Sequence, residues 1–402
     1  MPTGLSVRSP DRHADAADVV ELVARTFGNY YATRRESLGF YLLEGHYDWA
    51  ASAVGRIGGA LVSHWGVWDY RMRIGRAAVR CAGIGGVATD ADHRGKGHMA
   101  RTAAHGVERI RARGYPLSIL FGIDDFYHRF GYVAAWRESS WHLLRKDLPT
   151  SAERPPRLER IPFAPSAQVT RLHNQWNAGL TGTAIRPTFT TGFFHWARTS
   201  PHAWLWRDAR GRGAGHVFVH EDGGVLVTTE ATGDPDVVLA SLGRLAARLG
   251  LPALRFETLP YGSALARRLR TLNCRYEQRY ARDGEAMVRL VDLAGCLRAI
   301  EPELSRRLSS SALDGFRGTL RIEGPEGAAG LALDRGRVRV VPAKGGRTSL
   351  RAGWYLAQLL LGTDEPMETC EVGRIRLTGE AARLVPVLFP AQHPQLQLGD
   401  RY

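Results

Sequence analysis

The feature that most constrains the fold of this chain is a strand, a basic glycine loop and a helix that follow one another between residues 80 and 113. Residues 80–89 are apolar and rich in glycine, which is typical of a buried strand. The loop at 94–97 is Arg-Gly-Lys-Gly, and residues 97–113 have helical spacing that ends at Gly114. Glycine lets a backbone approach a ligand closely, and the amides at a helix start attract anions. The stretch therefore predicts a pyrophosphate site.

Two better-known phosphate loops do not match this stretch. The P-loop pattern G-x-x-x-x-G-K-[ST] is absent. A dinucleotide-binding fingerprint needs G-x-G-x-x-G inside a βαβ unit, whereas Ala100 stands at the third glycine and residues 49–89 predict antiparallel strands. An ordinary strand-to-helix loop with chance glycines remains the alternative interpretation.

The rest of the first 285 residues predicts a domain boundary and an internal repeat. Helical spacing at residues 15–27 precedes the first strands, and five prolines within residues 148–166 indicate a linker. A second block follows in an order that echoes the first, which favours a degenerate internal repeat. Its predicted elements are a hairpin at 217–227, a helix at 236–249, a strand at 253–257, a helix at 263–272 and a strand at 276–280.

A third block begins near residue 286 and mixes strands with helices. Its predicted elements are a strand at 286–292, a helix to 308, strands at 318–322, 330–334 and 337–341, and helices at 349–361 and 379–388. The whole chain is therefore expected to be an α+β protein of several domains.

The net charge of +14 suggests a nucleic-acid binder at first sight. Only three of the 54 basic residues are lysines, however, and no basic residues cluster in a run. This distribution favours a coding bias over a nucleic-acid surface, so we expect no nucleic-acid partner.

Cysteine spacing and hydropathy indicate a reducing, aqueous setting. Four cysteines lie far apart without a C-x-x-C pair, which argues against a zinc or redox motif and favours free thiols. No apolar run is long enough to span a membrane, and residues 1–6 do not start a signal peptide. We expect a cytoplasmic protein with no metal and no membrane partner.

Two motifs resemble a known family. Residues Arg94 to Met99 are similar to the R-x-x-G-x-[G/A] acetyl-CoA loop of GNAT acetyltransferases, and residues 126–132 resemble the Y-x-R-F-G-Y element of the enhanced-intracellular-survival (Eis) branch. Met99 departs from the small residue of the general motif, but that branch tolerates a bulky one. The resemblance implies GNAT-like mixed-sheet domains at 1–150 and 151–285 and a sterol-carrier-protein-like α/β domain at 286–402.

The resemblance also implies an acetyl-CoA-dependent N-acetyltransferase with a defined cofactor site. A bulged strand would offer backbone donors to the acyl oxygen and the pantetheine, and the loop would hold the pyrophosphate. The strand residues are Gly86, Val87, Ala88 and Thr89, and the loop residues are Arg94, Gly95, Lys96, Gly97, His98 and Met99. The second block lacks such a loop, because Gly211 to Gly215 precede a strand and are interpreted as a turn. We therefore expect one cofactor site.

Two tyrosines match the family's catalytic groups. Tyr127 matches the general acid, since a phenol of pKa about 10 can protonate a thiolate of pKa about 8.5. Tyr402, the last residue, implies that the terminal carboxylate is the general base, held by its aromatic ring. The alternatives are a packed Tyr127, a frayed terminus, and Asp124, Asp125, Glu138 or a water chain as the base. Tyr132 is interpreted as structural.

The acceptor is expected to be a small-molecule amine. Phe27, Asn29 and Tyr30 are its candidate contacts. Some members of the resembled branch acetylate aminoglycosides and carry acids at the positions of Asn29 and Arg401, so we expect an amine that is less charged than an aminoglycoside. The branch often forms hexamers, so the resemblance implies a homo-oligomer. The alternative function is a non-catalytic acyl-CoA-binding or interaction protein on a GNAT scaffold.

Overall fold

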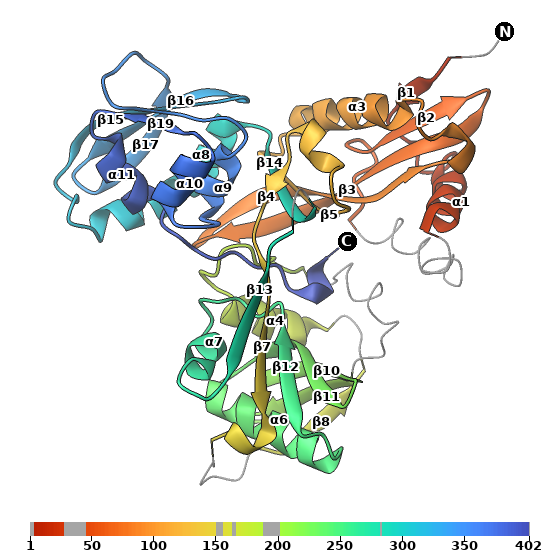
Figure 1. Ribbon diagram of the computed structural model, residues 1–402, viewed down its shortest axis with the longest axis vertical. Helices are drawn as coiled ribbons and strands as arrows, with labels where there is room; N and C mark the ends of the chain where they lie inside the picture. Colours follow the sequence, from red (N-terminus) through yellow and green to blue (C-terminus); the bar gives the residue numbers. More distant parts are fainter. Residues whose placement is uncertain are drawn as a thin grey trace.

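The computed structural model describes residues 4–27, 46–149, 156–162, 166–187, 202–281 and 284–401. Within these residues the strands form two seven-stranded sheets and one five-stranded sheet, each in its own lobe of the molecule (Figure 1). No helix of the described residues is long and apolar enough to cross a lipid bilayer.

The first sheet begins with antiparallel hairpins and then takes a parallel crossover. β3 is one continuous strand where the sequence suggested several short ones, and its partner β4 pairs in parallel with β5 because helix α3 (His98–Ala112) connects them. Helix α1 (Ala16–Phe27) packs on β3 and β4. In spatial order the strands are β1 (Ser6–Arg8), β2 (Ala53–Ile57), β3 (Ala60–Ile74), β4 (Ala77–Thr89), β5 (Leu117–Gly122), β14 (Glu285–Leu290) and β6 (Val133–Ala134).

The second sheet repeats this topology strand for strand. Its first four strands are antiparallel, β11 and β12 are parallel across helix α6 (Pro235–Arg248), and the last two pairs are antiparallel again. Helices α4 (Ala167–Trp176) and α7 (Ala264–Leu269) complete this lobe. In spatial order the strands are β8 (Glu159–Ile161), β9 (His202–Arg207), β10 (Gly213–Asp222), β11 (Val225–Thr232), β12 (Ala253–Glu257), β7 (Glu138–Leu144) and β13 (Arg275–Arg279). The structure thus supports the predicted internal repeat.

The two repeats exchange their sixth strands. β7 follows the first lobe in sequence, yet it pairs with β12 and β13, with Trp141 opposite Phe256. β14 follows the second lobe, yet it pairs with β5 and β6, with Val288 opposite Ile119. The sequence range 1–150 therefore contributes a strand to the second sheet, and the strand at 285–290 completes the first. Each sheet depends on the other part of the chain for a central pairing.

The third lobe packs its sheet against α8 and shares a core with the first sheet. Buried side chains of α8, such as Leu297, lie in the same cluster as Ile119 of β5. The strands are β15 (Arg317–Gly324), β16 (Gly327–Asp334), β17 (Arg337–Pro342), β18 (Ser349–Arg351) and β19 (Arg376–Thr378). The helices are α8 (Leu293–Ser309), α9 (Leu356–Leu361), α10 (Pro366–Val372) and α11 (Ala381–Leu388).

The predicted helix at 349–361 is wrong in its first part. Ser349–Arg351 is strand β18, which pairs with β15 on one side and β19 on the other. Leu350 is fully buried between Ile322 and Leu377 of these neighbours. A short apolar run is ambiguous between strand and helix, and here sheet pairing far away in sequence decides it.

The C-terminal segment leaves the third lobe and crosses to the other two. After α11 it runs past the second sheet, and the chain ends between the first and second lobes (Figure 1). Leu396 and Asp400 of this segment are buried. The segment is therefore part of the packed structure up to its last described residues.

Candidate active site

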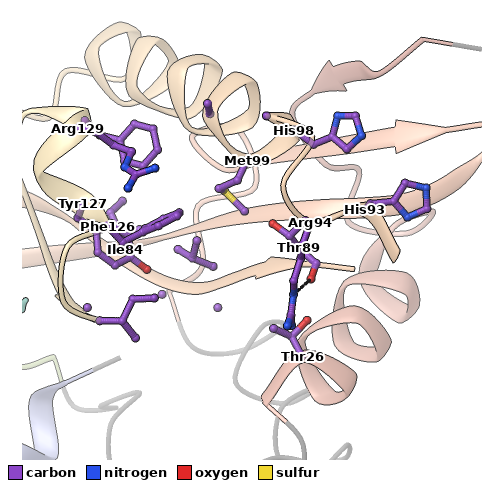
Figure 2. A pocket seen from close by; sticks show the side chains of 18 of the residues that line it. Thr26, Ile84, Thr89, His93, Arg94, His98, Met99, Phe126, Tyr127 and Arg129 are labelled. Carbon is purple, nitrogen blue, oxygen red and sulfur yellow. Dashed lines mark hydrogen bonds between the residues drawn. The ribbon is translucent and has the colours of Figure 1, made fainter. Parts of the chain in front are cut away.

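Strands β4 and β5 separate partway along their length. They pair only from Cys81 with Leu117 to Ile84 with Leu120. β4 then continues to Thr89 with β3 as its neighbour on one side and no strand of the described residues on the other, while β5 keeps its pairing with β14 as far as Gly122. The opening forms a cavity of about 930 Å³, with β4 and the start of α3 on one side and the end of β5 with the 3₁₀ turn Tyr127–Phe130 on the other (Figure 2).

A bulge sits where β4 leaves β5. The register between β3 and β4 shifts between His64 and Gly66, so β4 carries one extra residue there. Gly86 takes up the irregularity with a φ of 56°, in the left-handed region that glycine enters without strain. A bulge interrupts the ladder of backbone bonds and re-aims the strand. The bulge leaves backbone groups free for a ligand at residues 86–89, where the resemblance to GNAT acetyltransferases implies contacts with the acyl oxygen and the pantetheine.

His64 holds the bulge in place from the buried side. Its Nδ1 lies 2.7 Å from the carbonyl oxygen of Gly86, and its Nε2 lies 2.7 Å from the Tyr47 hydroxyl. A carbonyl only accepts, so Nδ1 carries the proton and Nε2 accepts from Tyr47. Complete burial lowers the pKa of His64 to about 4, which keeps the ring neutral. Sequence reasoning missed this residue, because a histidine within an apolar strand carries no motif of its own.

The loop before α3 leaves the first amides of the helix without a side-chain cap. Gly97 is the N-cap residue, with a φ of 75°, and it makes no side-chain capping bond. Gly95 has a φ of 74°, and no atom lies within 4 Å of a Cβ built on either glycine. These amides and the open space in front of them fit a diphosphate. Arg94 adds a full positive charge and donates from Nε to the Thr89 carbonyl oxygen at 3.3 Å.

Most of the expected cofactor residues line this single cavity. Figure 2 shows Met99 directed from α3 toward it, opposite Tyr127. The residues concerned are Gly86, Val87, Thr89, Arg94, Gly95, Gly97, His98 and Met99.

Three of the expected cofactor residues add no charged side chain to the cavity lining. The Ala88 side chain is buried in the cluster that contains Val19 and Val23 of α1, because side chains alternate along a strand. Lys96 lies outside the cavity lining and donates from Nζ to the Asp92 carbonyl oxygen at 2.8 Å. Desolvation, aided by nearby cations, lowers the pKa of His98, so its ring is neutral at pH 7. Within the cavity lining, the positive charge of the loop therefore comes from Arg94 and the helix dipole.

Tyr127 lines the cavity, and Tyr132 does not. Tyr127 is 8% exposed, its hydroxyl has no hydrogen-bond partner among the described residues, and burial raises its pKa to about 12. Its ring packs so closely on Gly122 that a Cβ there would lie 2.3 Å from it. The Tyr132 hydroxyl is instead buried in the core, 2.6 Å from Ser118 Oγ.

The acceptor side of the cavity is described in part. Phe27 lines the cavity and is 40% exposed, whereas Asn29, Tyr30 and Tyr402 lie outside the described residues. A neighbouring groove of about 720 Å³ shares Phe121 and Gly122 with the cavity, and its lining includes Glu138, Glu257, Glu277 and Glu285.

The other groups considered as a base differ in position. Glu138 lies in the neighbouring groove and binds Arg401, while Asp124 and Asp125 are exposed and line neither space. Among the described residues, no group of three or more His, Cys, Asp or Glu side chains is arranged to hold a metal ion.

Comparison with known proteins agrees with this geometry. Residues 9–135 match a family model described as an acetyltransferase (GNAT) domain. The lobe of the first sheet is therefore similar to a GNAT domain, and it is called the GNAT domain after this match. An uncharacterized N-acetyltransferase of Streptomyces coelicolor is 38% identical over 78 residues, a match that covers only 19% of this chain and 19% of that relative.

Similar folds extend over nearly the whole chain. A probable N-acyltransferase from Enterococcus faecalis is 20% identical, with a TM-score of 0.78 and 100% of both chains covered. Eis1 from Mycobacterium abscessus is 16% identical, with a TM-score of 0.71 and 99% of this chain and 100% of that chain covered. At these identities the likeness concerns the fold.

The second sheet has the topology of the GNAT domain but a different helix start. β11 also carries an extra residue, opposite Phe218 and Val219, as β4 does in the GNAT domain. Asp234, however, caps α6 with its own carboxylate, which accepts from the amides of Asp236 and Val237 at 3.0 and 3.2 Å. The carboxylate uses amides that the GNAT domain leaves free, and it would repel a phosphate.

The C-terminal segment occupies the corresponding end of the second sheet. The Leu398 amide donates to Thr258 Oγ1 at 3.1 Å, just beyond β12. Arg186 joins Asp400 of the segment to Glu230 of β11, with Nε 2.6 Å from Asp400 Oδ1 and Nη1 2.8 Å from Glu230 Oε1. All three charged side chains are buried. The second repeat therefore anchors the tail at the strand end where the GNAT domain has its cavity.

Proposed function

We propose that this protein is an acetyl-CoA-dependent N-acetyltransferase of the Eis type that acts on a small-molecule amine. The observation that carries the proposal is the continuity of one cavity. It joins the bulged end of β4, beyond its pairing with β5, to the uncapped start of α3 and to the Tyr127 ring. The GNAT domain at residues 9–135 and the fold shared with Eis1 support it.

The residues of the cavity fit acetyl-CoA, which supplies an acetyl group activated as a thioester. The amides at the start of α3 and the Arg94 guanidinium would hold the diphosphate. The backbone of β4 from Gly86 to Thr89 would donate to the pantetheine and the acyl oxygen. His64 keeps that backbone in its bulged shape, since it binds the Gly86 carbonyl from the opposite side.

Tyr127 is the proposed general acid. Burial raises its pKa to about 12, so the phenol keeps its proton at neutral pH. The same desolvation raises the pKa of a thiol placed beside it, so the phenol and the leaving thiolate remain matched. The packing of its ring against Gly122 fixes the direction from which the proton is delivered.

The carboxylate of Tyr402 is the proposed general base for the amine. The Arg186–Asp400 salt bridge fixes the chain two residues before Tyr402, which supports a defined position for the end of the tail. Neither the base nor the acid needs a metal ion in this scheme.

The third lobe is proposed to be a sterol-carrier-like domain with a structural role. It shares its core with the first sheet, and it supplies the tail that crosses to the other lobes. The proposed domain ranges remain 1–150, 151–285 and 286–402, with β7 and β14 exchanged between the first two sheets.

The experiment is a thiol-release assay with the full chain, acetyl-CoA and a panel of primary amines. We expect amine-dependent release of free CoA and acetylated amine by mass spectrometry. CoA binding without amine-dependent turnover on any amine would favour the non-catalytic alternative. Absence of CoA binding would contradict both.

A further inference from the structure

The groove beside the proposed active site is acidic, but its charges are already matched by arginines of the chain. Four glutamates line it, and each forms an ion pair with one arginine. The pairs are Glu138 with Arg401 at 2.7 Å, Glu257 with Arg255 at 3.0 Å, Glu277 with Arg275 at 2.9 Å, and Glu285 with Arg279. A cationic ligand entering the groove therefore meets arginines as well as carboxylates.

The four pairs differ in how easily an incoming cation can replace the arginine. The Arg275 and Arg279 side chains are 70% and 73% exposed, and ion pairs of that kind contribute little and are screened by salt. Arg401 and Glu138 are each only 16% exposed. Their pair is the least exposed of the four and resists exchange the most.

Arg401 is held in place by more than Glu138. Its Nη2 lies 2.9 and 2.7 Å from the two carboxylate oxygens of Glu138, and its guanidinium carbon lies 4.4 Å above the Phe121 ring. The preceding residue, Asp400, is fixed by the buried salt bridge to Arg186. These contacts hold the Arg401 guanidinium in one position, so it loses little conformational freedom when a ligand binds.

The position of Arg401 matters because Phe121, on which it packs, lines both the proposed acetyl-CoA cavity and the acidic groove. Phe121 and Gly122 line the proposed acetyl-CoA cavity and the acidic groove. An amine whose reacting nitrogen lies beside Tyr127 would extend the rest of its body past Phe121 into the groove. A second cationic group on that body would meet the Arg401 guanidinium above the ring.

We propose that Arg401 is a specificity-determining residue: a built-in counter-cation that neutralises Glu138 and disfavours acceptors carrying a second positive charge. The inference rests on the proposed function and deepens it to the acceptor class, amines with one positive charge. Specificity arises from repulsion of the wrong ligand as much as from attraction of the right one. Uncharged substituents pass Arg401, whereas a second ammonium group must displace it.

The test compares hexylamine with hexamethylenediamine, which differ in the second ammonium group. Each is titrated calorimetrically into the full chain in the presence of CoA, and each is assayed for kcat and KM with acetyl-CoA. In Arg401→Gln we expect the diamine-to-monoamine ratio of affinities, and of kcat/KM, to rise about tenfold, mainly through the KM of the diamine.

Three further variants separate charge from other effects. Arg401→Lys keeps the cation, so we expect a ratio within about twofold of the wild type. Arg383→Gln removes the same charge from an exposed pair with Glu380 in the third lobe, and its ratio should match the wild type. In a Glu138→Gln background, the gain from Arg401→Gln should shrink to less than about threefold, since the carboxylate that the diamine would gain is absent.

An unchanged ratio in Arg401→Gln overturns the proposal. Equal losses of kcat for both amines with no change in their relative affinity would do the same, because they would assign Arg401 only to placing the tail. The calorimetric measurement needs no turnover. If the chain binds CoA but acetylates neither amine, the proposed function is contradicted, and the relative affinities of the two amines still test this inference.

Discussion

The Nδ1 of His64 donates to the carbonyl oxygen of Gly86 across 2.7 Å, and this bond joins the interior of β3 to the bulge of β4. The carbonyl is thereby turned toward the core at the point where the opposite side of the strand faces the cavity. A buried, neutral histidine thus serves to shape the backbone that would receive the acyl group.

Replacing His64 should weaken the cofactor site. In His64→Leu the Gly86 carbonyl and the Tyr47 hydroxyl lose their partner, which costs about 2 kcal/mol of stability and loosens the bulge. We expect CoA to bind roughly tenfold more weakly by calorimetry. Tyr47→Phe is the control, because it removes the bond to Nε2 and leaves the bond from Nδ1 to the Gly86 carbonyl in place. Unaltered CoA affinity in His64→Leu would show that the bulge does not need the histidine.

His64 also predicts an acid-dependent loss of stability. Its folded pKa of about 4 lies below the ordinary value of 6.5, so the unfolded chain binds one more proton between these pH values. The contribution of the neutral His64 ring to the free energy of unfolding is fully present above pH 6.5. It falls by about 3 kcal/mol as the pH drops toward 4. Denaturant unfolding between pH 7 and 4 should show a shallower decline for His64→Leu than for the wild type. Equal slopes would contradict a buried neutral ring.

Removing the Tyr127 hydroxyl should affect turnover and spare cofactor binding. We expect Tyr127→Phe to lower kcat by about 100-fold, which is typical of a lost general acid, with CoA affinity within about twofold. Tyr132→Phe is the matched control. It breaks the bond to Ser118 and costs about 1 kcal/mol of stability with little change in kcat. Equal kcat values for the two variants would remove Tyr127 from the mechanism.

Gly122 should be intolerant of a methyl group. A Cβ at this position lies 2.3 Å from the Tyr127 ring, so Gly122→Ala forces the ring out of place. We expect kcat to fall at least about tenfold while the melting temperature drops by only a few degrees. Gly345→Ala in the third lobe is the control, because no atom lies within 4 Å of a Cβ built there and the residue is outside the cavity. Full activity in Gly122→Ala would mean that Tyr127 can act from another position.

Breaking the salt bridge between Arg186 and Asp400 should release the C-terminal segment. Asp400→Asn leaves the buried Arg186 with a single carboxylate partner, Glu230, and should cost about 3 kcal/mol of stability. Release of the tail should lower kcat without changing CoA affinity, and trypsin should cleave after Arg401 or its neighbours more readily. A variant with normal kcat and a protease-sensitive tail would separate the tail from catalysis.

The sequence was informative wherever structure is decided locally. The loop at 94–97 and helix α3 follow from glycines and helical spacing within one stretch, and β12 has the bounds that its pattern predicts. The β7–β14 exchange could not be predicted, because a strand pattern does not name a partner more than 100 residues away. The side chain of Ala88 turned toward the core for the same reason that its neighbours line the cavity: alternation along a strand. His64 needed the folded structure, since only there does it meet Gly86.

The most direct test of the central claim is a calorimetric titration of CoA into the wild type and into Gly97→Asp. The substitution places a carboxylate beside the uncapped amides of α3, where it would repel a diphosphate. Gly97→Asn has nearly the same size without the charge, so it controls for the strain of a side chain at the left-handed φ of this position. We predict one CoA bound per wild-type chain and a loss of at least about 100-fold in affinity in Gly97→Asp, with pantetheine, which lacks the diphosphate, binding both proteins equally weakly. Equal CoA affinity in the two proteins would contradict the placement of the diphosphate at the start of α3.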